Sequence, residues 1–453
     1  MSAYQASVRI NAELDESSAI RRKFVQCIVS TIINLAGSQV LRLAGNLILT
    51  RMLFPDAFGL MALVNLFLMG LAMFSDIGIG PGIVQRPGIL TPAFLQTAWT
   101  IQVLRAGGLF VLTCLIAYPI AVFYGQPALL WLLPATGLTQ LIAGFKSVAL
   151  HTYARDLRHG PLAIVEIATA LVGLLVSIFL AWQNPTVWAL VWGGLASAVF
   201  AVISSFRLPG QIQVRWMLDK AYAGELLRFG GWIFLGTALT FLASSGDRLM
   251  LGKFLTLEEL GIYTVAFFFA QSVSMLTRGV AARVLFPVLV QLRNSNLDSQ
   301  GKEYLRYRRI LLAGTILGVG ILMLGSHWLI AWLYDDRYAA AGPMLQVLSL
   351  GAAATSLVGL ADPVLLANGN SRGRMWLSFA EAAALLICMG VGGAHFGMKG
   401  YILGYVLAQF VSYIPSLLLV RPYKVATPLS DAAFLIGIAL IAALSHSLNP
   451  ISF

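Results

Sequence analysis

Runs of about 20 apolar residues, separated by short polar breaks, fill most of this 453-residue sequence. A helix needs about 20 mostly apolar residues to cross a hydrocarbon core of about 30 Å. With 58% hydrophobic residues, 11% charged residues and a mean hydropathy of +0.82, the chain is too apolar for a soluble multidomain protein. We therefore predict an all-α integral membrane protein with about thirteen transmembrane helices, over residues 25–53, 58–78, 96–123, 127–149, 161–182, 186–206, 230–254, 260–288, 309–334, 342–366, 374–394, 399–420 and 430–447.

Lysine and arginine are distributed unevenly between the two sides that these helices define. If the amino terminus is cytoplasmic, 21 of the 30 fall in cytoplasmic segments, four in outer loops and five within helices. Cytoplasmic loops of membrane proteins carry such an excess. The asymmetry predicts a multi-pass protein with a cytoplasmic amino terminus, and its net charge of +11 favours contact with anionic lipid headgroups over nucleic acid.

Several chemistries find no support in the sequence. Cys27, Cys114 and Cys388 lie far apart and give neither a disulfide framework nor a metal-ligand spacing. No Gly-rich loop followed by Lys and Ser or Thr is present to cradle a nucleotide phosphate. The first 20 residues are polar and lack the features of a secretory signal, so we expect a retained cytosolic tail. We expect no metal, no cofactor and no enzymatic activity.

An internal repeat is visible at an offset of 202 residues. "LTRMLFPDAFGL" (49–60) aligns with "LGKFLTLEELGI" (251–262), and the match joins the first two predicted helices to the seventh and eighth. Parallel repeats of this kind relate the halves of many secondary transporters about an axis along the membrane normal. The repeat predicts twelve core helices in two six-helix halves, with one additional helix. The matched pairs are Leu49 with Leu251, Arg51 with Lys253, Leu53 with Leu255, Asp56 with Glu258 and Gly59 with Gly261.

Polar residues form stripes at helical spacing on three of these repeat-related helices. A charge inside the membrane costs roughly 2.5–3.5 kcal/mol and normally faces a partner or water. We expect the stripes to line a shared hydrated cavity, although the Ser and Thr members fit helix–helix hydrogen bonds equally well. The residues predicted to line this cavity are Gln39, Arg42, Asn46, Arg105, Ser244, Asp247, Arg248, Gln271, Ser274, Arg278 and Arg283.

Acidic residues within the apolar runs are candidates for ion coupling or for pairing. Asp247, Asp76 and Asp362 are candidates for binding a proton or Na⁺, while Asp247 is equally suited to balance the adjacent Arg248. Asp362 precedes Pro363, which is expected to break or kink a helix. For Glu166 and Glu381, ion pairing with Arg158 or Arg374 is the simpler interpretation.

Six segments in order give the chain a family resemblance. They are "TRMLFPDAFGLMAL", "FSDIGIGPGIVQR", "TVWALVWGG", "ELLRFGGW", "DRLMLGKFLTLEELGIYTVA" and "VLFPVLVQLR". Together they resemble the polysaccharide-transport branch of the multidrug/oligosaccharidyl-lipid/polysaccharide (MOP) exporter superfamily, which includes the Wzx-type flippases. The resemblance extends from about residue 21 to residue 420.

This resemblance implies two lobes around a cavity lined by helices 1, 2, 7 and 8. It also implies a substrate, a repeat-unit oligosaccharide joined through pyrophosphate to a polyprenyl lipid. The protein would move it across the bacterial inner membrane for synthesis of O-antigen, capsule or exopolysaccharide. Membrane lipids, a polysaccharide polymerase and export machinery are the further partners suggested.

The expected domain organisation follows from the helices and the resemblance. Residues 1–24 are the cytosolic tail, 25–206 an N-lobe of helices 1–6, and 207–229 a cytoplasmic interfacial linker. Residues 230–420 are a C-lobe of helices 7–12, and 421–453 an extra carboxyl-terminal helix. Because twelve or fourteen helices are usual in such families, the thirteenth is the part of this topology that departs from the pattern.

Two alternatives stay open. A drug or cation exporter of the same superfamily would share the fold, although a cavity with more arginine than acid suits cations poorly. A multipass sugar polymerase or ligase would need acid–base groups on an outer loop, where only His395 and the pair Asp335 and Asp336 are available.

Overall fold

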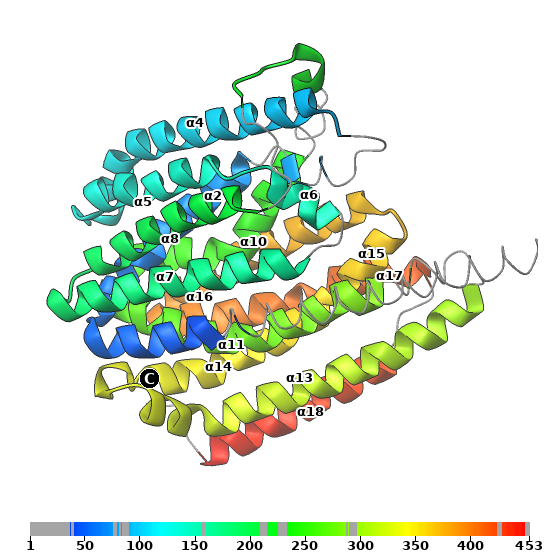
Figure 1. Cartoon of the computed structure of the whole chain (residues 1–453). Coiled ribbons are helices and arrows are strands. Elements are labelled where there is room, and N and C mark those ends of the chain that lie inside the picture. Colours follow the sequence, from blue (N-terminus) through cyan, green and yellow to red (C-terminus); the bar gives the residue numbers. More distant parts are fainter. Residues whose placement is uncertain are drawn as a thin grey trace, which may run out of the picture. The chain divides into compact units, whose positions relative to one another are not determined.

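The structure is a computed structural model of the whole chain (Figure 1). It describes residues 37, 40–75, 79–80, 83, 90–155, 159–208, 215–224, 233–286, 289, 297–423 and 428–448. Within these residues the regular elements are all helical, with no strand, and nine helices are long and apolar enough to cross a membrane. The predicted all-α membrane fold is confirmed, while the count of thirteen helices stays a prediction.

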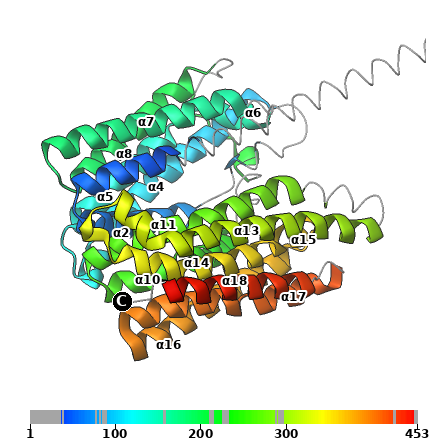
Figure 2. The same cartoon turned by 90° about the horizontal axis from the view of Figure 1, so that it is seen from below.

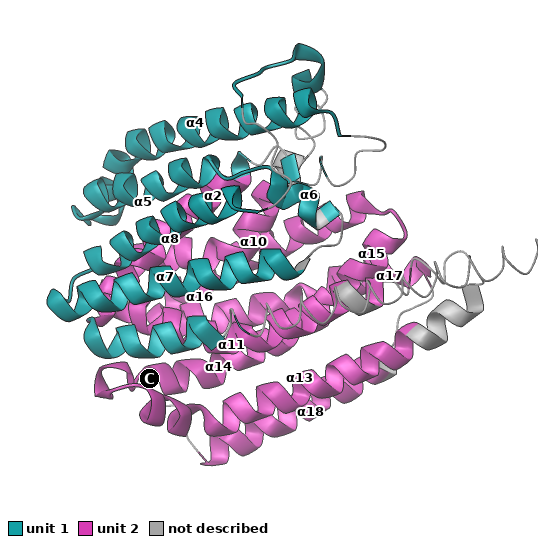
Figure 3. Ribbon diagram, viewed as in Figure 1, with its two compact units in different colours: residues 1–53, 74–234 teal, residues 54–73, 235–453 magenta. Residues whose placement is uncertain are grey.

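The chain divides into two compact units that each comprise two segments of sequence (Figure 3). Unit 1 contains residues 1–53 and 74–234, and unit 2 contains residues 54–73 and 235–453. The short segment 54–73 therefore leaves the amino-terminal half of the sequence and packs with the carboxyl-terminal half.

Unit 1 is built from helical residues 40–52 and five labelled helices. These are α4 (Pro92–Tyr124), α5 (Leu129–Gly144), the short α6 (Ala149–Arg155), α7 (His159–Gln183) and α8 (Trp188–Phe206). Helices α4 and α5 pack against each other, as do α7 and α8, and α5 joins the two pairs by packing on α8 (Figure 2).

Local sequence sets the ends of α4. Thr91 is its N-cap, since the Thr91 hydroxyl accepts a hydrogen bond from the Phe94 N–H at 3.3 Å, and Pro92 follows at the first helical position. At the other end Gly125 adopts φ 66°, the left-handed conformation that terminates many helices.

Residues 215–224, the longer described part of the predicted interfacial linker, lie against the start of α4. The backbone N–H groups of Met217 and Asp219 donate to the hydroxyls of Thr100 and Thr97 at 3.1 and 3.2 Å. The Trp216 side chain stays 63% exposed. Apolar and basic side chains on one surface segment fit a position at the headgroup layer, which stays a prediction.

Unit 2 contains α2 (Pro55–Phe74) and the helices that follow residue 233. These are α10 (Ile233–Phe254), α11 (Leu257–Val280), a π-helical turn (Ala281–Leu285), α13 (Leu297–Leu333), a 3-10 turn (Asp336–Tyr338), α14 (Ala341–Gly359), α15 (Ala361–Ala367), α16 (Ser371–Val411), α17 (Tyr413–Val420), a 3-10 turn (Arg421–Tyr423) and α18 (Pro428–Leu448).

Helix α14 is the core of unit 2. Every residue of α14 except Leu350 is buried, and α11, α13 and α16 pack around it. The helices around it expose apolar side chains instead, such as Leu317 at 67% and Phe396 at 73%. Apolar residues exposed along such helices are expected to face lipid.

The backbone of unit 2 leaves helical geometry at two places, once within a predicted span and once between two predicted spans. A single turn residue, Leu360, separates α14 from α15, so the predicted break before Pro363 is observed. In α16 the backbone leaves helical geometry at Gly397, with φ 59° and ψ −138°. Gly397 lies between predicted spans 374–394 and 399–420, and glycine adopts a positive φ without the steric cost of a side chain.

A buried ion pair joins α18 to α13, which lie side by side (Figures 1 and 2). Arg308 Nη2 and Nε donate to Asp431 Oδ1 at 2.7 and 3.1 Å, and Tyr413 donates to Asp431 Oδ2 at 2.6 Å. Arg308 Nη1 donates to the Tyr304 hydroxyl at 2.8 Å. Because both charges are bonded on several sides, this part of the predicted extra helix is held by specific polar contacts.

Candidate functional site

Asp247 and Arg248 lie at one end of a line of polar side chains in unit 2. The Asp247 carboxylate is buried, and Tyr263 of α11 donates a hydrogen bond to its Oδ2 at 2.8 Å. Arg248 Nε lies 3.8 Å from Asp247 Oδ1, an electrostatic contact longer than a hydrogen bond. The Arg248 guanidinium also sits over the Phe267 ring, 5.2 Å from its centre. The acid is therefore paired inside unit 2.

The line continues along α11 through Gln271 and Ser274. Gln271 Nε2 donates to the Tyr405 hydroxyl of α16 at 2.6 Å, and the Ser274 hydroxyl donates to Gln271 Oε1. Tyr405 also packs edge-on against Phe267 at 5.7 Å. The Ser274 bond therefore stays within α11, whereas the Gln271 bond crosses to α16 and is a helix–helix contact.

Arg278 lies one turn further along α11 and crosses Gly359 of α14. A Cβ on Gly359 would lie 2.8 Å from Arg278 Cγ and 3.1 Å from Cδ, so the absence of a side chain makes room for the arginine. The Nε of Arg278 is buried and has no hydrogen-bond partner among the described residues. Buried donors without a partner are uncommon in proteins, which makes Arg278 a candidate binding residue.

Asp362, Arg374 and Glu381 form a cluster close to Arg278. Arg374 Nε lies 2.7 Å from Asp362 Oδ1, and Arg374 Nη1 lies 3.6 Å from Glu381 Oε2. The predicted pairing of Glu381 with Arg374 is confirmed, and Asp362 shares the same guanidinium. Arg278 adds a second positive charge that acts on both carboxylates. The cluster is charge-balanced.

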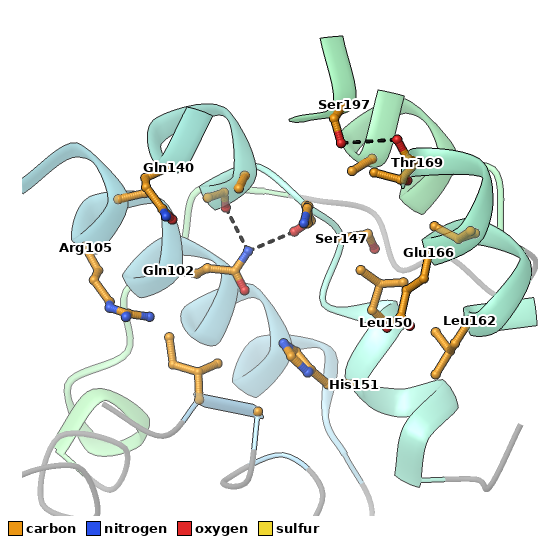
Figure 4. Close-up of a pocket in the computed structure, with 18 of the residues that line it drawn as sticks. Gln102, Arg105, Gln140, Ser147, Leu150, His151, Leu162, Glu166, Thr169 and Ser197 are labelled. Carbon is orange, nitrogen blue, oxygen red and sulfur yellow. Dashed lines mark hydrogen bonds between the residues drawn. The ribbon is translucent and has the colours of Figure 1, made fainter. Parts of the chain in front are cut away.

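Unit 1 contains a pocket of about 750 Å³ (Figure 4). Its walls come from α4, α5, α6, α7 and α8, and its charged lining residues are Arg105, Lys146 and Glu166. Figure 4 shows Arg105 and Glu166 at opposite sides, with Gln102 and His151 between them in this view. The polar lining residues are Gln102, Arg105, Gln140, Lys146, Ser147, His151, Glu166, Thr169 and Ser197.

Hydrogen bonds hold one wall of this pocket in place. Gln102 Nε2 of α4 donates to the carbonyl oxygens of Gly144 and Lys146 at 2.7 and 3.0 Å. These carbonyls lie at the end of α5, where helix geometry leaves acceptors without partners. Arg105 Nε donates to the Ser75 hydroxyl at 3.0 Å. The turn that carries Lys146 is thereby tied to α4.

The other predicted cavity residues differ in how far the structure describes them. Arg42 is exposed, and the Asn46 side chain is half-buried. Ser244 is exposed, and its hydroxyl donates to the Phe241 carbonyl at 3.3 Å. Gln39, Asp76 and the Arg283 side chain lie outside the described residues. Within the described part of the chain, no group of three or more His, Cys, Asp or Glu side chains is placed to hold a metal ion.

The structure brings to these sites several residues that the sequence did not predict to be there. Tyr263 and Tyr405 supply partners for Asp247 and Gln271, and Gln102 and His151 line the unit 1 pocket. Tyr263 lies 16 positions from Asp247, on the next helix, so no spacing within one helix identifies it. The sequence offers one weak indication of its role, which is a Tyr hydroxyl within an apolar run, since a buried Tyr hydroxyl usually has a hydrogen-bond partner.

Residues 48–313 match the family described as "Polysaccharide biosynthesis protein". The chain belongs to this polysaccharide biosynthesis protein family. It is similar to the lipopolysaccharide biosynthesis protein WzxC of Escherichia coli (strain K12), with 22% identity over 377 residues that cover 82% of this chain and 75% of WzxC. It is likewise 22% identical over 349 residues to the succinoglycan biosynthesis transport protein ExoT of Rhizobium meliloti (strain 1021), covering 74% and 68% of the two chains.

Two solved structures share the fold of this chain. A lipid II flippase, MurJ, in an inward closed conformation superposes with a TM-score of 0.68 at 14% identity, covering 94% of this chain and 97% of its own. An inward-facing multidrug transporter of the MOP superfamily superposes with a TM-score of 0.66 at 14% identity, covering 93% and 99%. These superpositions confirm the fold that the resemblance to the MOP exporters implied.

Proposed function

We propose that this protein moves a polyprenyl-pyrophosphate-linked oligosaccharide across the bacterial inner membrane, for synthesis of a surface polysaccharide. The observation that carries the proposal is the family match over residues 48–313 on a fold shared with a lipid II flippase. The relatives WzxC and ExoT, named for lipopolysaccharide and succinoglycan biosynthesis, support a saccharide substrate.

Arginine side chains are assigned to the headgroup. A pyrophosphate carries concentrated negative charge, and a guanidinium can grip it with several N–H donors in a planar fork. Arg248 and Arg278 both have a buried Nε without a hydrogen-bond partner among the described residues. Arg278 is the stronger candidate because Arg248 already lies 3.8 Å from the Asp247 carboxylate. Arg42 and Arg248 are proposed to act with it, and Gln39, Asn46, Ser244, Gln271 and Ser274 to meet sugar hydroxyls.

The topology belongs to the same proposal. Thirteen spanning helices, a cytoplasmic amino terminus, and lobes over residues 25–206 and 230–420 follow from the charge asymmetry and the repeat. Asp247, Asp76 and Asp362 are the proposed sites for a coupling ion. For Asp247, the contacts with Tyr263 and Arg248 support the alternative role of balancing a buried charge.

The decisive experiment is flipping in reconstituted vesicles. A fluorescent lipid-linked oligosaccharide is placed in both leaflets, and the fraction reached by an impermeant quencher or a glycosidase is followed with and without protein. We expect protein-dependent exchange that Arg278→Ala reduces at least about tenfold, since several charge-assisted hydrogen bonds are lost. Exchange of a cationic dye with no exchange of the lipid would favour the drug exporter instead, whose fold is the same.

A further inference from the structure

The pocket of unit 1 has the lining of an anion site, although no step of the proposed translocation uses it. Two of its side chains, Arg105 and Lys146, carry positive charge, against one carboxylate, Glu166. Lys146 follows α5, which ends at Gly144, and its half-buried ammonium interacts electrostatically with Glu166. A partly desolvated ammonium gains more from an anion than a hydrated one does.

The rest of the lining suits a carbohydrate more than a small ion. Gln140 and Ser197 offer hydrogen-bonding groups, and the Thr169 hydroxyl is buried with no partner among the described residues. A volume of about 750 Å³ lies within the range of small-molecule sites, about 300–1,000 Å³, and far exceeds the needs of one phosphate. An apolar wall for the C–H faces of a sugar ring is supplied by Leu109, Leu150, Leu162 and Val165.

We propose that this unit 1 pocket binds a sugar that carries an oxyanion, a carboxylate or a phosphate, with Lys146 and Arg105 as its charge partners. Glu166 neutralises Lys146 in the empty pocket and is displaced from that role when the anion arrives. The inference rests on the proposed saccharide function and deepens it: the pocket would select acidic repeat units. The oxyanion could come from the saccharide or from a lipid headgroup, and the probes below separate these sources.

The test is binding to the purified full-length protein in a neutral detergent, measured by titration calorimetry. The probes are trigalacturonic acid, the neutral trisaccharide maltotriose, inorganic phosphate, and a short-chain phosphatidylglycerol. We expect trigalacturonic acid to bind at least about tenfold more tightly than maltotriose or phosphate. Tighter binding of phosphatidylglycerol than of trigalacturonic acid would overturn the sugar assignment in favour of a lipid headgroup.

Four variants assign the binding to this pocket. Lys146→Gln and Arg105→Gln should each weaken trigalacturonic acid binding about tenfold, Lys146→Arg should retain most of it, and the exposed control Lys220→Gln should leave it within twofold. Unchanged affinity in Lys146→Gln would overturn the proposal.

Glu166→Gln should increase affinity, a result that misfolding of the variant would not produce. For an anionic ligand, removal of the carboxylate should raise affinity about threefold or more. If Glu166→Gln instead abolishes binding while Lys146→Gln strengthens it, the ligand is a cation and the proposal is wrong. Failure of lipid-linked oligosaccharide flipping, with this binding pattern intact, would overturn the proposed function alone.

Discussion

Gly59 of α2 and Gly261 of α11 lie against the start of each other's helix. A methyl group on Gly59 would overlap the carbonyl oxygen of Leu257, and one on Gly261 would overlap the carbonyl oxygen of Pro55. Both pairs, 59 with 261 and 55 with 257, are 202 positions apart, the offset of the sequence repeat. Reciprocal contacts between equivalent residues are the property of a two-fold axis, so the crossing supports the repeat.

Alanine at either glycine should disrupt this crossing. The added methyl group meets backbone rather than a movable side chain, so we expect Gly59→Ala and Gly261→Ala each to destabilise the protein by about 1–3 kcal/mol. Thermal unfolding of the detergent-solubilised protein is the measurement. Gly279→Ala on the same α11 is the matched control, because a methyl group there would meet no atom within 4 Å. Equal melting temperatures for Gly261→Ala and Gly279→Ala would contradict a tight crossing.

Variants that remove the charge of Asp247 alone, or of Asp247 and Arg248 together, distinguish the two proposed roles of Asp247, which are charge pairing and ion coupling. Asp247→Asn keeps the shape but leaves Arg248 without its acid, so transport should fall several-fold. The double variant Asp247→Asn with Arg248→Gln should recover most of the loss, because no unpaired charge remains. The assay is flipping under imposed proton or Na⁺ gradients. If Asp247→Asn binds substrate but no longer responds to a gradient, Asp247 is instead the coupling residue.

Because Arg278 packs over Gly359, a substitution at Gly359 should move the arginine side chain while keeping its charge. Gly359→Ala should push the arginine side chain aside, because the new methyl group would lie only 2.5, 2.8 and 3.1 Å from its Nε, Cγ and Cδ. We expect weaker binding of lipid-linked oligosaccharide, about threefold to tenfold, with near-normal stability because the arginine is flexible. Gly314→Ala, which meets no neighbour within 4 Å, should have no effect on binding. Parental affinity in Gly359→Ala would argue against a role for Arg278 at this position.

Because the Arg308–Asp431 pair is buried, replacing one partner should destabilise the protein more than replacing both. Arg308→Met should lower stability by about 3–5 kcal/mol, since it strands a buried carboxylate. Arg308→Met with Asp431→Leu should cost much less, as no uncompensated charge remains. The neighbouring Arg309 is exposed, so Arg309→Met should be neutral. Thermal unfolding again gives the comparison, and a double variant as unstable as Arg308→Met would show that the pair does more than cancel charge.

Orientation in the membrane follows from the Lys and Arg asymmetry and is tested by reporter fusions. A reporter that is active only in the periplasm should be silent when fused after residues 158, 217 and 300, and active after residues 125 and 336. Gly125 follows the end of α4, and residue 336 begins the turn after α13, so both of these fusion points avoid helix interiors. Activity after residue 217 would refute the six-plus-six topology.

Much of the fold could be predicted because its main determinants are local. An apolar run of about 20 residues must be helical in a bilayer, since the backbone has no water to satisfy its polar groups. Pro363 marks the break between α14 and α15 for an equally local reason. The family resemblance was recognisable too, because its motifs lie in continuous segments of the chain.

What only the tertiary structure decided is which polar groups meet across helices. The stripes on α10 and α11 place Asp247 and Gln271 on helix faces, but their partners Tyr263 and Tyr405 lie 16 and 134 positions away. Likewise, residues 54–73 pack with unit 2 instead of with their sequence neighbours. The sequence determines the period and polarity of each helix, whereas side-chain pairing depends on the rotation and crossing of neighbouring helices. Those are set by close packing among residues far apart in the chain, as at the crossing of α2 and α11.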